Sequence, residues 1–221
     1  MSSKRPTTDA LIESLVQDAA PSPRLFSAGA VVAGWLAAAT AYAVGLTVIL
    51  GPVRGDAWQQ FTTNMTFATE ITVAILAFIL LAAYAVRSSI PGRSNKTFLW
   101  FGTAGLITFV ALIASGLITP YLEPSMHGKR DHCIWEAFLY SVPSVTGLAY
   151  LLQRRYLLTP RLTLATGAAA AGLIPAVTMQ WACMHDPVHG LAFHVAPIFA
   201  LIAAVLLARL GYERLFLQGN V

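Results

Sequence analysis

The chain has 221 residues, of which 57% are hydrophobic and only 11% are charged, with 14 Lys and Arg against 10 Asp and Glu. Several stretches exceed the roughly 18 apolar residues that mark a membrane-spanning helix, so the composition excludes a soluble globular protein. The basic residues are spread in small numbers over many loops without a basic helix face, and we therefore expect no direct contact with nucleic acid.

The leader, residues 1–24, precedes the apolar segments, and its stretch TTDALIESLVQDAAPSPR predicts a short helix. Thr8 is suited to cap this helix, and Pro21 and Pro23 end it. Apolar residues repeat at i, i+4 and i+8 and form one stripe along it. The stripe consists of Leu11, Ile12, Leu15, Val16 and Ala19.

The polar face of the leader helix carries Asp9, Glu13 and Asp18 and no Lys or Arg. A helix of about twelve residues is marginal alone in water, so its apolar stripe must be buried against something. The stripe can lie on the lipid surface, pack on the rest of the protein or occupy a hydrophobic groove of a soluble partner. Helices bound to a membrane surface are usually basic, which argues against the lipid alternative.

Six continuous apolar segments follow the leader. Backbone groups in lipid must be satisfied within their own segment, and continuous apolar runs do not fit the alternating strands of a β-barrel. The sequence therefore predicts an all-α fold, an integral membrane six-helix bundle (25–212) with a short cytoplasmic N-terminal helix (1–24) and a cytoplasmic tail (213–221). The six spans are predicted at residues 25–50, 66–86, 98–118, 134–152, 162–183 and 188–210.

The basic residues are distributed unequally between the two sides of the predicted bundle. Eleven of the fourteen Lys and Arg fall in the termini and the loops on the same side, whereas the other side has only Arg54, Lys129 and Arg130. Short cytoplasmic loops accumulate Lys and Arg. The sequence therefore predicts a multi-pass membrane protein with both termini in the cytoplasm.

The metal-capable side chains gather on the predicted outer side. All five histidines and both cysteines fall in the outer loops or within about two turns of them. The stretch WACMHDPVHGLAFH, residues 181–194, alone holds three of the histidines and one cysteine. So one-sided a distribution indicates an outward-facing site. The residues concerned are His127, His132, His185, His189, His194, Cys133 and Cys183.

Cys133 begins the fourth predicted span and Cys183 ends the fifth, so an antiparallel helix pair would bring both thiols to one depth. Three alternatives remain open for them. They are small buried apolar residues, they form a disulfide in the oxidising exterior, or they bind a soft divalent metal such as zinc or cadmium together with imidazole ligands. The candidate metal ligands are Cys133, Cys183, His132 and one of His185 or His189.

Asp186 followed by Pro187 predicts the N-cap and first residue of the sixth span. This places His189 in the first turn and His194 more than a turn deeper. Five residues rotate a side chain by about 140° on an α-helix, so the two imidazoles cannot share one face. A site that uses both needs a bent helix, and Pro197 is nearby.

Glu70 lies about one turn into the second predicted span, near its outer end. Burial of a carboxylate in a membrane is expensive, so an intramembrane glutamate is a candidate functional site. The alternative is that Glu70 is interfacial and hydrated. In either case it can extend the outer cluster.

Three features combine in this sequence: the acidic leader TDALIESLVQDAAP, the Pro91-Gly92 pair after the second span, and two solitary outer cysteines at 133 and 183. Together they resemble the NrsF family of bacterial inner-membrane regulators. The resemblance implies a non-enzymatic anti-sigma factor whose leader holds an extracytoplasmic-function sigma factor of the sigma-F type at the membrane. It also implies release of the sigma factor on a heavy-metal or oxidant signal from outside.

The resemblance assigns sensing to Cys133 and Cys183 and sigma-factor binding to the leader. The leader residues expected to contact the sigma factor are Asp9, Leu11, Ile12, Leu15, Val16 and Asp18.

A second function class is a membrane thiol oxidoreductase that passes electrons from an outer dithiol to quinone. Such enzymes usually carry a low-pKa thiol beside a resolving one, often as CxxC, whereas Cys133 and Cys183 are isolated in the sequence. A metal transporter would need polar residues at the centres of several spans. The span centres here are almost wholly apolar, so transport is disfavoured.

Overall fold

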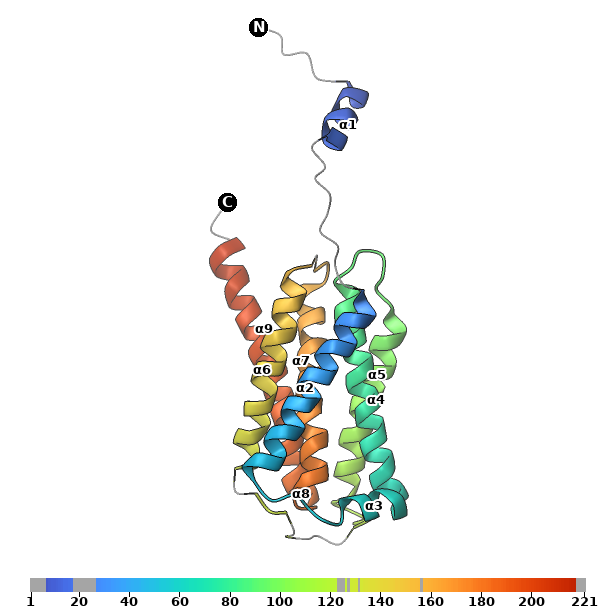
Figure 1. Cartoon of the computed structure of the whole chain (residues 1–221), viewed down its shortest axis with the longest axis vertical. Coiled ribbons are helices and arrows are strands. Elements are labelled where there is room, and N and C mark those ends of the chain that lie inside the picture. Colours follow the sequence, from blue (N-terminus) through green and yellow to red (C-terminus); the bar gives the residue numbers. More distant parts are fainter. Residues whose placement is uncertain are drawn as a thin grey trace.

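The structure, a computed structural model, describes residues 7–17, 27–122, 126, 128–130, 132–155 and 157–217. All regular structure in these residues is helical. Among them, six long helices form a bundle in which each helix runs opposite to the one before it (Figure 1). They are α2 (Ala28–Leu50), α4 (Met65–Ser88), α5 (Lys96–Ser115), α6 (Cys133–Gln153), α7 (Pro160–Ala182) and α9 (Ala196–Tyr212).

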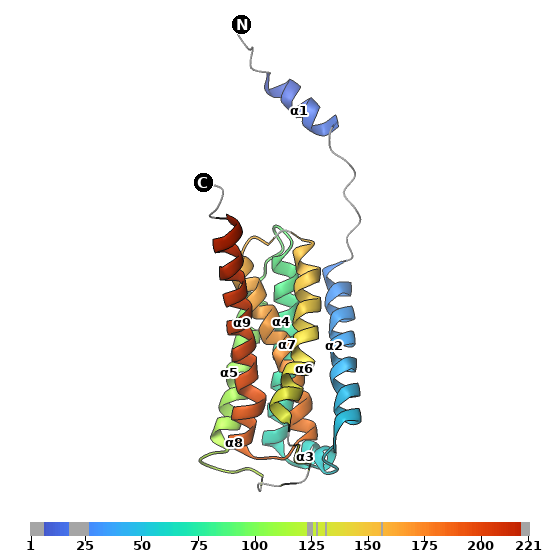
Figure 2. The same cartoon turned by 90° about the vertical axis from the view of Figure 1, so that its left-hand side faces the viewer.

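Shorter helices complete the chain. α3 (Ala57–Thr63) lies between α2 and α4, and a π-helical segment, η2 (Glu213–Leu217), extends α9. Before α9, α8 (Pro187–His189) leads into another π-helical segment, η1 (Gly190–Val195). Helices α2, α5 and α7 end at the same end of the bundle at which α4, α6 and α8 begin (Figure 2). We call this the cysteine end, because Cys133 and Cys183 both belong to it.

Helix α7 lies at the centre of the bundle, packed against α4, α6 and α9. Its middle is the small-residue run GAAAAG, residues 167–172, which is buried throughout. Small side chains allow neighbouring backbones to approach closely. A Cβ added to Gly172 would lie 3.1 Å from the Cα of Ile198 in α9. This packing fixes the position of Cys183, the residue that follows α7, relative to its neighbours.

Five helical segments in the described residues are long and apolar enough to cross a membrane: α2, α4, α5, α7 and Pro187–Leu215. The fourth predicted span, residues 134–152, is helical as α6 and packs in the bundle with Tyr140 and Leu148 buried. It is not one of the five candidate spans, and it carries Glu136 and Pro143 within its length. The fold is therefore an all-α bundle with five candidate spans.

Basic residues separate between the two ends of the bundle. Arg54, Lys129 and Arg130 lie in the loops of the cysteine end. The other described Lys and Arg lie toward the opposite end, where α2 begins and α9 finishes: Arg87, Arg93, Lys96, Arg154, Arg155, Arg161, Arg209 and Arg214. The folded bundle thus keeps the charge asymmetry that the sequence predicts.

The leader helix is α1 (Thr8–Gln17). Its described side chains are exposed, and among them Ile12 is 54% and Val16 is 69% exposed. The Thr7 hydroxyl accepts a hydrogen bond from the Ala10 N–H (3.4 Å), so Thr7 caps the helix and Thr8, the cap expected from the sequence, is its first residue. Of the other leader residues singled out by sequence, Asp18 and Ala19 and the side chains of Leu11 and Leu15 lie outside the described residues.

Candidate metal centre

Two antiparallel helices bring the cysteines together. Cys133 is the first residue of α6, and Cys183 is the C-cap of α7, where its N–H donates to the Met179 carbonyl (2.7 Å). Their Sγ atoms lie 3.0 Å apart, and both residues are free, buried cysteines. The Cys133 thiol also lies 3.4 Å from the Arg130 carbonyl.

The loop after Cys183 turns back onto it. The Asp186 carboxylate accepts a hydrogen bond from the His189 N–H (3.1 Å), and Pro187 is the first helical residue, as the Asp-Pro pair predicts. This cap starts the last helix directly beside the end of α7. As a result the Nε2 atom of His189 lies 3.4 Å from the Cys183 Sγ.

His194 lies on the same face as His189, and the expectation that the two imidazoles cannot share a face is wrong. The residues between them form the π-helical segment η1 instead of an α-helix bent at Pro197. Hydrogen bonds in a π-helix link residues about five apart, so a side chain five positions on returns to nearly the same face. The two rings meet edge to face with centroids 5.1 Å apart.

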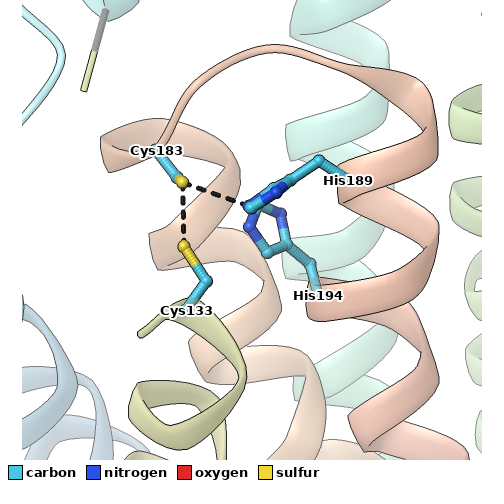
Figure 3. Close-up of side chains that lie close together, drawn as sticks. All are labelled: Cys133, Cys183, His189 and His194. Atoms are coloured by element: carbon cyan, nitrogen blue, oxygen red, sulfur yellow. Dashed lines mark hydrogen bonds between the residues drawn. The ribbon is translucent and has the colours of Figure 1, made fainter. Parts of the chain in front are cut away.

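Cys133, Cys183, His189 and His194 thus converge, and their four side chains point toward one another (Figure 3). One ligand atom from each lies within 4.8 Å of all the others. A tetrahedral zinc ion with bonds of about 2.3 Å to sulfur holds its two sulfurs about 3.8 Å apart. The cysteine sulfurs at 3.0 Å need to separate by less than an ångström to reach that value. The residue set and its spacing therefore fit a soft divalent metal.

A chain of polar side chains leads away from His194. Its Nδ1 lies 2.7 Å from the Gln180 Oε1, and the Gln180 amide donates to Glu70. The other carboxylate oxygen of Glu70 accepts from the Tyr121 hydroxyl. Glu70 is 0% exposed, so it is a buried carboxylate rather than a hydrated one. Its partners come from α7 and from the loop after α5, which makes it a junction between three parts of the bundle.

The electrostatic surroundings favour a thiolate at Cys183. A hydrogen bond from the Cys133 thiol, with a smaller contribution from His189, holds the pKa of the Cys183 thiol well below its usual range, although burial acts in the opposite direction. Burial lowers the pKa of Arg54, which remains a nearby cation that pairs with Asp56 (3.1 Å). Burial and the neighbouring Glu70 raise the pKa of Tyr121, which keeps it a hydroxyl donor.

Two histidines predicted as metal ligands lie outside this group. His132 is exposed at the N-cap of α6, and its side chain makes no capping hydrogen bond. His185 is buried, with its ring edge to face against those of Phe67 and Tyr121. Burial, and then the charge of Arg54, lowers the pKa of His185 to about 4, so it is a neutral packing residue at pH 7. His127 lies outside the described residues.

Glu136, one turn from Cys133 on α6, is occupied by an ion pair. Its carboxylate lies 2.8 Å from the Nε of Arg130. The same guanidinium donates to the carbonyls of Thr47 and Pro52, each at 2.8 Å. Arg130 thereby joins the end of α2 to the start of α6, and its own carbonyl contacts the Cys133 thiol.

The loops of the cysteine end cover the cluster. The Arg54 N–H donates to the Ala182 carbonyl (2.9 Å), which holds the loop after α2 against the end of α7. Gly128 has φ +75°, and a Cβ at this position would lie 2.6 Å from the same carbonyl oxygen. Only glycine fits both the conformation and the close contact. The thiols and His194 are consequently between 0% and 3% exposed.

Of the predicted metal ligands, both cysteines and His189 lie in this group, whereas His194 and Gln180 were not predicted to belong to it. The signal for Gln180 was a polar residue in an otherwise apolar span, one turn before Cys183. His194 lies five positions after His189, and this spacing places the two rings on one face only if the helix between them is a π-helix such as η1.

The comparison with known families agrees with the resemblance noted in the sequence. The NrsF family, described as "Negative regulator of sigma F", matches residues 15–213 of the chain. This range contains the whole bundle and the last residues of α1. No match was found among curated proteins or among solved structures. Because the family match covers well over half of its length, the chain belongs to the NrsF family of negative regulators of sigma F.

Proposed function

We propose that the protein is an anti-sigma factor of the bacterial inner membrane that holds an extracytoplasmic-function sigma factor through its leader and senses a soft divalent metal at its cysteine end. The observation that carries the sensing part is the convergence of Cys133, Cys183, His189 and His194 on one buried point. Membership in a family of negative regulators of sigma F supports the regulatory part.

In this proposal α6 is a sixth membrane span and both termini are cytoplasmic. With 21 residues, α6 is long enough to cross a bilayer core of about 30 Å. Its polar side chains are satisfied inside the protein, because Glu136 pairs with Arg130 and the hydroxyls of Ser141 and Ser144 donate to carbonyls of their own helix. The excess of basic residues at the opposite end supports an external cysteine end.

The leader acts as the sigma-binding element. Ile12 and Val16 are exposed one turn apart on α1, which suits insertion into a hydrophobic groove. Asp9 precedes them in the first turn, and an acidic first turn suits a basic partner surface. Leu11, Leu15 and Asp18 complete the contact set that we propose.

Metal binding is proposed to shift the bundle between two packings. The ligands come from the start of α6, the end of α7 and the start of the last helix, so the ion joins three helices. A metal can shift this equilibrium only by its difference in affinity for the two states. A hundredfold weakening of sigma-factor binding requires a coupling free energy of about 2.7 kcal/mol.

A disulfide between Cys133 and Cys183 is the alternative signal, since the thiols are in contact. An external oxidant would take two electrons, the thiols would lose two protons, and one sulfur–sulfur bond would form. The convergence of two imidazoles on the same thiols favours the metal, because imidazoles can be metal ligands whereas a disulfide requires only the two sulfurs. The thiol oxidoreductase alternative has less support, since both cysteines are buried and exchange with a substrate needs access.

A labelling experiment in right-side-out membrane vesicles tests this function. A membrane-impermeant maleimide should modify Cys133 and Cys183 slowly, and zinc or cadmium should block the reaction. Retention of the sigma factor by the same vesicles should fall as metal is added. Metal-independent labelling that appears only after reduction would instead establish the disulfide, and sigma-factor release by a C133S/C183S variant would overturn sensing by these thiols.

A matched pair of exposed positions tests the orientation. In the C133S/C183S background, Lys129→Cys carries a new thiol at the cysteine end and Arg93→Cys carries one at the opposite end. The impermeant maleimide should label the first and not the second. The reverse pattern would overturn the external position of the cluster.

A further inference from the structure

The geometry points to Gln180 and Glu70 as positioning residues that hold the His194 proton on Nδ1 and direct its Nε2 lone pair into the metal site. This inference rests on the proposed metal function of the cluster. Gln180 lies on α7 and Glu70 on α4, and neither is itself a proposed metal ligand. Gln180 contacts the proposed ligand His194, and Glu70 contacts Gln180.

The direction of each hydrogen bond follows from the donors and acceptors available. Glu70 presents one carboxylate oxygen to the Gln180 side chain and the other to the Tyr121 hydroxyl. A carboxylate oxygen accepts, so the amide nitrogen of Gln180 faces Glu70 and its amide oxygen faces the opposite way. Glu70 therefore sets the orientation of the Gln180 amide.

The amide oxygen of Gln180 lies 2.7 Å from the Nδ1 of His194. An amide oxygen only accepts, so the Nδ1 atom must carry the proton. In a neutral imidazole the Nε2 atom then has a free lone pair. Glu70, on helix α4, thus determines the tautomer of His194 through the Gln180 amide.

The Nε2 atom of His194 is buried and has no hydrogen-bond partner among the described residues. A buried polar atom without a partner is costly. Here the unpaired atom belongs to the group whose ligand atoms lie within 4.8 Å of one another. A metal ion at that point would satisfy it.

Histidine ligands of metals usually donate their second N–H to a carboxylate or carbonyl, and loss of that partner costs about 10- to 100-fold in affinity. In this protein an amide stands between the histidine and the carboxylate. Gly190 lies beside this amide: a Cβ there would be in ordinary contact with the Gln180 Oε1 at 3.5 Å and tighter, at 3.2 Å, against the Ile113 side chain. The relay also links the site to α4, a helix that supplies no ligand.

A swap of the two side chains tests the relay. In the full chain, Gln180→Leu removes the acceptor for His194. In E70Q/Q180E the amide at position 70 donates to the carboxylate at position 180, which accepts the His194 proton, so every donor still meets an acceptor. Thr178→Val is the control, since its hydroxyl bonds only to carbonyls of α7.

Zinc affinity is measured by competition with a chelator, and the protonated nitrogen of His194 is read from the ¹⁵N spectrum of the metal-free protein in detergent. We expect Gln180→Leu to weaken zinc about 10- to 100-fold, and the swap and the control to stay within about threefold of wild type. We expect an Nδ1–H signal in wild type and the swap. Unchanged zinc affinity in Gln180→Leu, or an Nε2–H signal in wild type, would overturn the inference.

Two further results separate this inference from the proposed function. If the wild-type protein binds no zinc, the metal function fails, while the ¹⁵N spectrum still decides where the His194 proton lies. If Gln180→Leu does not fold, the swap and the wild-type spectrum decide the question without it.

Discussion

His189 and His194 contact each other through their rings, 5.1 Å between centroids, although five residues separate them in a helix. Segment η1 makes this possible and ends at Val195, so α9 continues as an α-helix with Ile198 and Leu201 buried in the core. One continuous helix therefore provides two converging imidazoles at its start and a packing face along its length.

The ligand set predicts which histidines matter for metal binding. Replacing His189 or His194 by alanine should weaken zinc by more than the 10- to 100-fold that is typical of outer-shell changes, because a direct ligand is lost. His132→Ala should leave the affinity unchanged, since His132 is exposed outside the cluster. Chelator competition and the thiolate-to-cobalt absorption band measure this. An equal loss of zinc affinity in His132→Ala would instead support the ligand set expected from the sequence, which includes His132.

Metal addition and removal should change the stability of the bundle. Zinc at about a hundred times its dissociation constant should raise the free energy of unfolding by about 2.7 kcal/mol, because it binds the folded state. A non-thiol chelator should reverse the gain. Thermal unfolding in detergent, followed by tryptophan fluorescence, measures the shift. The C133S/C183S variant serves as the control, and an equal shift in it would place the binding elsewhere.

Arg130→Met should destabilise the cysteine end strongly. The substitution leaves the Glu136 carboxylate without its cation and the carbonyls of Thr47 and Pro52 without their donor. Breaking a buried pair in this way costs about 3–5 kcal/mol. Lys129→Ala, at the exposed neighbouring residue, should change stability by less than about 0.5 kcal/mol. Chemical unfolding of both variants tests the contrast, and R130M/E136L should recover part of the loss.

The leader should lose its partner when its apolar stripe is charged. Val16→Asp places a carboxylate on the exposed stripe of α1, so the sigma factor should no longer be retained by membranes that contain the protein. Ser14→Ala, also exposed on α1, should retain it. Thermal unfolding of the bundle should be the same in both variants. Retention by Val16→Asp membranes would show that another surface holds the sigma factor.

Much of the bundle could be predicted because helix length and order follow from continuous apolar runs. The contact of Cys133 with Cys183 follows from the same order, since consecutive antiparallel helices share their ends. The Asp186-Pro187 start of the last helix was likewise readable, because capping is a local property. Helix α3 was not expected, since its seven residues lie in what the sequence presents as a loop.

The rest of the site depends on information that a linear pattern does not hold. His194 was excluded as a partner of His189 by α-helical geometry, and only the π-helical hydrogen bonding of η1 brings it into the cluster. Glu70 and Gln180 are 110 positions apart, so their contact exists only after α4 packs on α7. His132 was favoured for its place beside Cys133, but neighbouring residues at a helix start point in different directions.

The burial of the cluster would limit how fast the proposed metal sensor responds. Cys183 is 0% and His194 is 1% exposed beneath loops that are bonded to the end of α7. In the proposed function, an ion would reach the two thiols and His194 only when the loops around them move, and this movement would slow its capture. A bound ion would leave by the same route. A proposed sensor of this kind would average the metal concentration over time, so sustained exposure would release the sigma factor and brief fluctuations would not.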